Sequence, residues 1–293
     1  MSKIRVGVLG ATGAVGQRFA QMLTGHPYFD LQVLAASERS AGKAYQEATN
    51  WILTDPMPAH LAEMTVQDMS INLDCEILFS ALPTSEAREW ESRFAAAGYA
   101  VFSNAGAHRM DDDVPLLIPE VNPDHLELIK SQKTKGSIIT NPNCSTIGLV
   151  LALKPIHDAF KIKDVNVVTL QAISGSGYPG LPSMDILDNV IPFIGGEEDK
   201  VENEPLKLLG KFNEDKIDCA EMNVSAQCNR VGVIDGHLEC VQVNFEKETS
   251  VEEIKEVLKN FKSVPQELNL PFAPENPIEY LENPKHPQPR IHR

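Results

Sequence analysis

The chain has 293 residues, of which 41 are acidic and 26 are basic, and its formal net charge is −15. This length fits two domains of ordinary size, and the acidic balance argues against nucleic acid or anionic lipid as a partner. No apolar run reaches the roughly 18–20 residues of a membrane helix, and the N-terminus lacks the apolar core of a signal peptide. We therefore expect a cytoplasmic protein with no membrane or nucleic-acid partner.

Short apolar runs alternate with helical stretches in the first half of the chain. Strands are expected over residues 3–9, 31–36, 76–81 and 99–103, and helices over residues 17–23 and 85–97. Gly98 is expected to end the second of these helices. This alternation predicts an α/β fold with a Rossmann-like, doubly wound parallel sheet, and we place a nucleotide-binding domain at residues 1–143.

The rhythm changes after residue 143. Helices are expected over residues 145–160 and 250–261, and strands over residues 165–173, 224–234 and 238–245. Asp235-Gly236 between the last two strands is a turn signal typical of an antiparallel hairpin, and Ser250 with Glu253 forms a capping box. Residues 144–293 are therefore expected to form an α+β catalytic and dimerisation domain on a mainly antiparallel sheet. Its last 30 residues hold seven of the 20 prolines, so little regular structure is expected there.

A glycine-rich loop follows the first predicted strand and opens the first helix. It contains Gly10, Thr12, Gly13, Ala14, Val15 and Gly16. Gly10 permits a tight turn, Gly13 lets a pyrophosphate approach the backbone, and Gly16 allows close packing of helix on sheet. This strand–loop–helix setting predicts dinucleotide binding, and a merely tight turn is the alternative.

The residues after the second predicted strand indicate which dinucleotide binds. Ser37, Arg39 and Ser40 offer two hydroxyls and a guanidinium, which suit a 2′-phosphate and favour NADP over NAD. In the alternative, Glu38 binds a ribose hydroxyl and Arg39 is a solvated charge.

Cys144 follows Asn141-Pro142-Asn143 at the start of a long predicted helix. The positive end of the helix dipole is expected to lower the pKa of this thiol and to make it a nucleophile. The five cysteines of the chain are widely spaced and contain no Cys-x-x-Cys pair. Neither a disulfide framework nor a metal site is therefore expected.

Charged and titratable residues near the predicted loops suggest an anionic substrate. His237 lies at a turn, where an imidazole can act as acid or base near neutral pH, and Arg230 is a bidentate carboxylate binder by chemistry. Glu197 and Lys200 share one face of a predicted helix, where they form either an ordinary ion pair or separate contacts to a substrate. Arg109 is a further cation near a loop.

Six segments in register resemble motifs of the aspartate-semialdehyde dehydrogenase family, in the branch typical of archaea and fungi. They span residues 10–16 (GATGAVG), 103–109 (SNAGAHR), 141–146 (NPNCST), 171–177 (QAISGSG), 196–200 (GEEDK) and 230–237 (RVGVIDGH). The resemblance implies NADP-dependent interconversion of L-aspartyl 4-phosphate and L-aspartate 4-semialdehyde plus phosphate, in lysine, methionine and threonine biosynthesis. It also implies a homodimer or tetramer.

The resemblance assigns a role to each site residue. Cys144 would form the thioester, His237 would act as acid and base, and Gln171 would orient the reacting carbonyl. The substrate would be held by Arg230 at its carboxylate, Glu197 at its ammonium group, Arg109 and Lys200 at its phosphate, and Asn143 beside the thiol. Gly177 would lie against the nicotinamide. Family members continue beyond Pro-Gln-Pro-Arg with a strand and a helix that touches the cofactor, so we expect the chain to lack that closing segment.

Two alternatives stay open on the sequence alone. One is a related acyl reductase that acts on malonyl-CoA or N-acetyl-glutamyl phosphate, although an amine-binding Glu197 would serve no purpose with malonyl-CoA. The other is a truncated, non-catalytic relative that binds only a nucleotide or a partner subunit.

Overall fold

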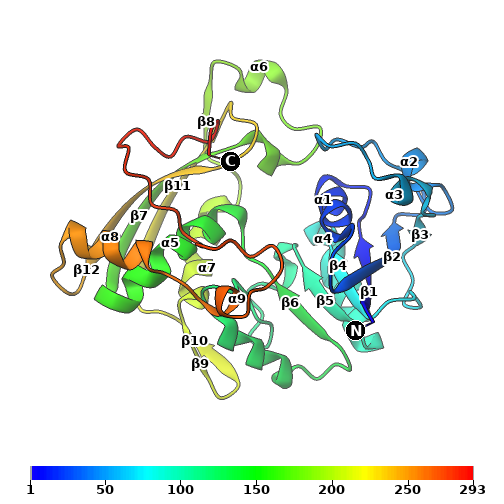
Figure 1. Cartoon of the computed structure of the whole chain (residues 1–293), viewed down its shortest axis with the longest axis horizontal. Coiled ribbons are helices and arrows are strands. Elements are labelled where there is room, and N and C mark those ends of the chain that lie inside the picture. Colours follow the sequence, from blue (N-terminus) through cyan, green and yellow to red (C-terminus); the bar gives the residue numbers. More distant parts are fainter. Residues whose placement is uncertain (1, 293) are drawn as a thin grey trace. The chain divides into compact units, whose positions relative to one another are not determined.

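The computed structural model describes residues 2–292, and the chain forms two compact units (Figure 1). One unit combines Met1–Leu116 with Leu126–Asn141, and the other combines Leu117–His125 with Pro142–Arg293. The 3-10 segment η2 (Pro123–Ser131) contributes to both.

The first unit is built on a parallel sheet of six strands. They are β1 (Ile4–Leu9), β2 (Phe29–Ala36), β3 (Gln67–Asp68), β4 (Ile77–Ser80), β5 (Ala100–Ser103) and β6 (Ser137–Thr140), in the spatial order β3-β2-β1-β4-β5-β6. Every neighbouring pair is parallel. The predicted doubly wound sheet is thus confirmed. In such a sheet ligands bind where the strand order reverses, here at the carboxyl ends of β1 and β4.

Apolar side chains cover both faces of this sheet. Val6 and Val8 of β1 belong to one buried cluster and Leu9 belongs to another, because successive side chains of a strand point to opposite faces. The helices of this unit are α1 (Ala14–Leu23), α2 (Tyr45–Ala48), α3 (Ala59–Glu63), α4 (Thr84–Ala97) and the 3-10 turn η1 (Gly106–His108). Gly98 ends α4 with a φ of 111°, as predicted.

The second unit contains a mixed sheet of four strands. They are β7 (Ile162–Gln171), β8 (Val190–Pro192), β11 (Asn223–Val231) and β12 (Leu238–Phe245), in the order β12-β7-β11-β8, and β9 (Lys211–Asn213) pairs with β10 (Lys216–Asp218) in a separate hairpin. The helices are α5 (Cys144–Phe160), η3 (Ile173–Ser176), α6 (Ser183–Ile186), α7 (Glu197–Leu208), α8 (Val251–Lys259) and α9 (Val264–Glu267). The capping box of Ser250 and Glu253 is present at the start of α8. In the described part of the tail, residues 268–292 contain no helix or strand.

The predicted hairpin of β11 and β12 is wrong, because β7 lies between these two strands. Strand β7 pairs parallel with β11 and antiparallel with β12. The link between β11 and β12 crosses the end of β7, where Ile173 and Ser174 donate their backbone N–H groups to the carbonyls of Val233 and Ile234, at 2.7 and 3.0 Å. The turn signal at Asp235-Gly236 therefore belongs to a crossing link, and the sheet is mixed.

Two carboxylates of helix α7 accept hydrogen bonds from backbone N–H groups at the edge of strand β11. Glu198 accepts a hydrogen bond from the backbone N–H of Cys228 at 3.1 Å, and Glu202 accepts one from Ala226 at 3.0 Å. The two glutamates are one helical turn apart and their partners are two strand residues apart, so the helix lies along the strand. These carboxylates take the place of a neighbouring strand beyond the residues that pair with β8.

Candidate active site

Cys144 is the first residue of α5, and Asn143 is its N-cap. The side-chain Oδ1 of Asn143 accepts hydrogen bonds from the backbone N–H groups of Ser145 at 3.0 Å and Thr146 at 3.3 Å. An asparagine is well suited to this position because its short side chain satisfies helix N–H groups that have no intrahelical partner. The predicted placement of Cys144 at a helix start is confirmed.

His237 faces the thiol of Cys144. Its Nε2 atom lies 3.1 Å from Sγ, and its Nδ1 atom lies 3.0 Å from the backbone nitrogen of Ala172. Because the Ala172 N–H donates to Nδ1, the neutral ring carries its proton on Nε2, next to the sulfur. Burial and the charge of Arg230 lower the pKa of His237, which favours this neutral form.

The predicted lowering of the pKa of Cys144 is wrong. Cys144 is exposed by its surface area, but the protein packed around its sulfur still desolvates the thiol, and the Glu197 carboxylate adds a like charge, so the pKa of Cys144 is raised. The backbone N–H groups of Ser145 and Cys144 and the charge of Arg230 act in the opposite direction. The helix start therefore favours the thiolate, as expected, but it does not outweigh the desolvation of the sulfur and the charge of Glu197.

Glu197 connects three of the other predicted site residues. Its carboxylate accepts hydrogen bonds from Asn143 Nδ2 at 2.8 Å and Gln171 Nε2 at 3.5 Å, and it forms an ion pair with Lys200 at 2.8 Å. Burial opposes ionisation of this carboxylate, but the hydrogen bonds from Lys200 and Asn143 outweigh it and lower the pKa of Glu197. Glu197 is thus an anion within the cluster.

Arg230 is buried, with 6% of its surface exposed, and its Nη1 donates to the carbonyl of Ala172 at 2.7 Å. A Cβ added to Gly175 would lie 2.9 Å from this Nη1 and 3.5 Å from His237 Cε1. A larger residue at this position would therefore displace the guanidinium of Arg230. Sequence reasoning missed Gly175 and the backbone of Ala172, although both lie within the 171–177 motif.

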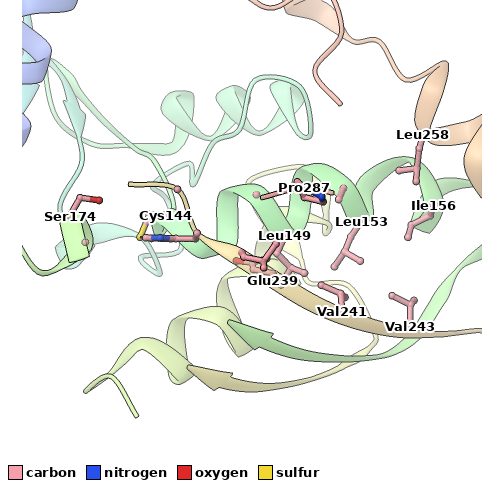
Figure 2. Close-up of a pocket in the computed structure, with 16 residues that line it drawn as sticks. Cys144, Leu149, Leu153, Ile156, Ser174, Glu239, Val241, Val243, Leu258 and Pro287 are labelled. Atoms are coloured by element: carbon pink, nitrogen blue, oxygen red, sulfur yellow. The ribbon is translucent and has the colours of Figure 1, made fainter. Parts of the chain in front are cut away.

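A cavity of about 890 Å³ extends from Cys144 within the second unit (Figure 2). Helix α5 lines it with Leu149, Leu153 and Ile156, and β12 lines it with Glu239, Val241 and Val243. Among its described lining residues the ionisable side chains are Cys144, His237 and Glu239. Burial raises the pKa of Glu239 to about 7. Glu239 was not predicted as a site residue. The sequence did hold a signal for it, because it lies two residues after His237 and alternate side chains of an extended chain point to the same side.

The glycine loop of the first unit leaves room for a pyrophosphate. Gly10 has a φ of 70°, and an added Cβ would lie 2.7 Å from the Ala81 carbonyl oxygen; a Cβ on Gly16 would lie 2.2 Å from the Gly10 oxygen. Gly13 is the N-cap of α1, and as a glycine it has no side chain that could cap the first N–H groups of the helix. Thr12, Ala14 and Val15 complete this turn and the start of α1. An uncapped helix start above a glycine cradle fits a pyrophosphate group.

The remaining predicted residues lie on exposed or separate segments. Ser37 and Arg39 are exposed directly after β2, and the Ser40 N–H closes the turn onto the Ser37 carbonyl at 2.8 Å. Arg109, in the first unit, is buried and donates from Nη2 to the Asn104 carbonyl at 2.9 Å. Gly177 has a φ of 73°, which explains a glycine there, and no described atom lies within 4 Å of the position of an added Cβ. The contacts predicted for these residues with cofactor or phosphate stay predictions.

The described residues contain no group of three or more His, Cys, Asp or Glu side chains able to hold a metal ion. No helix between residues 2 and 292 is long and apolar enough to cross a membrane.

Two family models match the chain. One, described as semialdehyde dehydrogenase, NAD binding domain, matches residues 5–129. The other, described as semialdehyde dehydrogenase, dimerisation domain, matches residues 153–293.

Curated relatives and solved structures resemble almost the whole chain. The aspartate-semialdehyde dehydrogenase of Archaeoglobus fulgidus is 56% identical over 98% of this chain and 84% of its own length, and that of Saccharomyces cerevisiae is 46% identical over 98% and 84%. The crystal structure of aspartate semialdehyde dehydrogenase with NADP from Candida albicans matches with a TM-score of 0.92 and 42% identity, over 99% of this chain and 85% of that chain. Aspartate semialdehyde dehydrogenase II complexed with ASA from Vibrio cholerae matches with a TM-score of 0.71 and 28% identity, over 89% and 80%.

Proposed function

The chain belongs to the aspartate-semialdehyde dehydrogenase family, and we propose that the cluster around Cys144 is its catalytic centre. It is an NADP-dependent oxidoreductase of amino-acid biosynthesis that interconverts L-aspartyl 4-phosphate and L-aspartate 4-semialdehyde plus phosphate. The observation that carries the assignment of the centre is the 3.1 Å distance between Cys144 Sγ and His237 Nε2.

Cys144 is the proposed nucleophile. Its thiolate attacks the acyl carbon of aspartyl phosphate, so that a C–S bond forms, the C–O bond to phosphate breaks and phosphate leaves with the electron pair. Sulfur suits this step because a thiolate is nucleophilic near neutral pH and the resulting thioester is readily reduced. Lys200 is proposed to supply positive charge for the departing phosphate, and the family resemblance gives the same role to Arg109.

The glycine loop is the proposed NADP site. Residues 10 and 12–16 would hold the pyrophosphate, Ser37, Arg39 and Ser40 the 2′-phosphate, and Gly177 would leave space for the nicotinamide. When bound, NADPH supplies the two electrons that reduce the thioester.

His237 is the proposed acid and base. Its Nδ1 atom is engaged by Ala172, so Nε2 is the nitrogen that can exchange a proton with the reacting groups. In the neutral ring this nitrogen donates a hydrogen bond, first to the thiolate and then to the oxygen of the substrate. A full proton transfer from Nε2 requires that the ring take up a proton at Nδ1, which displaces the Ala172 N–H. Gln171 would help to orient the reacting carbonyl.

Two charges of opposite sign fit the amino-acid part of the substrate. The buried guanidinium of Arg230 is proposed to bind the carboxylate, and the ionised Glu197 is proposed to bind the ammonium group, with Asn143 beside the thiol. Lys200 forms an ion pair with Glu197, and we propose that it turns to the phosphate when the ammonium group binds Glu197. An amine-binding Glu197 favours the aspartyl substrate over malonyl-CoA.

The test is phosphate-dependent formation of NADPH from aspartate semialdehyde. We expect turnover by the parent protein, none by Cys144→Ser, and turnover close to the parent by Cys219→Ser, which changes another exposed cysteine. Circular dichroism checks that each variant is folded. A folded parent without turnover, or an active Cys144→Ser variant, would contradict the proposal.

The proposal also covers the roles of the two domains, the oligomeric state and the location of the protein. Residues 1–143 would bind the cofactor and residues 144–293 would carry catalysis and dimerisation. The description of the second family model as a dimerisation domain supports a homodimer or tetramer. Light scattering after gel filtration measures this state. A cytoplasmic location is proposed because the substrate and cofactor are small metabolites.

A further inference from the structure

Glu204 is a buried carboxylate that contacts the residue before Cys144. It lies on α7, only 2% of its surface is exposed, and its Oε2 accepts the backbone N–H of Asn143 at 2.7 Å. A carboxylate is rarely buried to this extent unless hydrogen bonds compensate for the water that it loses. This contact was not predicted, because Glu204 and Asn143 are 61 residues apart in the sequence.

Helix α7 contacts Asn143 through two carboxylates. Glu197 accepts the side-chain Nδ2 at 2.8 Å, and Glu204 accepts the backbone N–H. The two glutamates are seven residues apart, which places them on one face of the helix, two turns from each other. Glu198 and Glu202 use another face of the same helix to accept N–H groups from β11.

Asn143 is therefore held at its backbone and at both ends of its amide group. Its Oδ1 in turn caps α5 by accepting the N–H groups of Ser145 and Thr146. Cys144 is the next residue, and the N–H groups of Ser145 and of Cys144 itself favour its thiolate. The position of the sulfur, and the direction of the N–H groups that face it, depend on this cap.

We propose that Glu204 is a positioning residue that fixes Cys144 through the hydrogen bond it accepts from the backbone N–H of Asn143. The proposal rests on the function proposed for Cys144 as nucleophile. Without the carboxylate, a buried N–H group would lose its partner and the cap would be free to shift. A shift of about 1 Å at a reacting atom can cost about 100-fold in rate.

The test compares two substitutions of Glu204 with a matched control. Glu204→Ala removes the acceptor, and Glu204→Gln keeps an acceptor oxygen while removing the charge. Glu202→Ala is the control, because Glu202 also accepts a backbone N–H, at 3.0 Å, but from Ala226 in β11. The readouts are the pH profile of iodoacetamide alkylation of Cys144, followed by peptide mass spectrometry, and kcat with KM for aspartate semialdehyde.

We expect Glu204→Ala to lower kcat about tenfold or more and to shift the alkylation profile to higher pH, while KM changes less than about threefold. Glu204→Gln and Glu202→Ala should stay within about threefold of the parent in kcat and in alkylation rate. An unchanged profile and kcat in Glu204→Ala would overturn the proposal, and so would equal losses in Glu204→Gln and Glu204→Ala. Alkylation needs no turnover, so it tests this positioning role even if the parent protein shows no dehydrogenase activity.

Discussion

His237 holds Nε2 at 3.1 Å from Cys144 Sγ while the backbone N–H of Ala172 occupies its other ring nitrogen at 3.0 Å. Protonation of the ring would place a second N–H against that of Ala172, and burial and Arg230 already lower the pKa of His237 below its ordinary 6.5. Activity should therefore be lost only as the pH falls through a value below 6.5.

The pH dependence of kcat/KM checks this acid limb. Replacement of the imidazole by His237→Ala should lower kcat roughly 10²–10⁴-fold, the range typical of a general acid or base, and remove the limb. An acid limb centred above pH 6.5 in the parent would contradict this tautomer, and so would its persistence in the variant.

Removal of the Glu197 charge should make Cys144 more reactive in the ligand-free protein. This carboxylate is one of the causes that raise the pKa of the thiol, so Glu197→Gln should lower that pKa and speed alkylation several-fold at a pH near 8. The same variant should raise KM for aspartate semialdehyde, because the ammonium group loses its anion.

Glu198→Gln is the matched control, since Glu198 is the next residue on α7 but faces Cys228 of β11. Its alkylation rate should equal that of the parent. Slower alkylation in Glu197→Gln would show that its hydrogen bond to Asn143 matters more than its charge.

Glu239 should make the stability of the protein depend on pH. The folded protein holds a proton on this carboxyl up to a pH of about 7, whereas the ordinary value is 4.5. Between these values the folded state binds more protons than the unfolded state, so the free energy of unfolding falls as the pH rises, by up to about 3 kcal/mol from this group.

Urea unfolding at about pH 5 and about pH 7 measures the effect. Glu239→Gln should lose less stability than the parent over this interval, and the exposed substitution Glu252→Gln serves as the control. Equal losses in Glu239→Gln and the parent would show that this carboxyl does not titrate there.

Two glycines of the same loop should respond differently to alanine. A Cβ at position 16 would lie 2.2 Å from the Gly10 oxygen, which is backbone and cannot move aside, whereas a Cβ at position 13 would lie 3.4 Å from the same oxygen. Gly16→Ala should therefore destabilise the ligand-free protein by about 2 kcal/mol or more. Gly13→Ala should keep its thermal midpoint and raise KM for NADPH about tenfold, because the added methyl group obstructs the pyrophosphate. The reverse order of stabilities would contradict the geometry of the loop.

Local sequence signals predicted much of the fold and of the site. The glycine loop, the end of α4 at Gly98, the capping box of α8 and the start of α5 depend on residues close together in the chain. The pairing of β11 with β7 depends on a link that crosses a strand end, and the same turn signal suits a hairpin equally well. The pKa of Cys144 could not be predicted because it depends on Glu197, which is 53 residues away in the sequence. Glu204 was missed for the same reason.

The backbone of Ala172 contacts both His237 and Arg230. Its N–H binds the ring of His237, and its carbonyl oxygen accepts the guanidinium of Arg230 at 2.7 Å. The proton-carrying group and the proposed carboxylate anchor thus cannot be moved independently, and a displacement of this one residue would misalign the substrate and the acid in a single step. Both hydrogen bonds use backbone atoms of Ala172, so the type of side chain at this position does not reveal the coupling. Engineering the substrate range of this site will have to preserve the path of the backbone as well as the charged side chains.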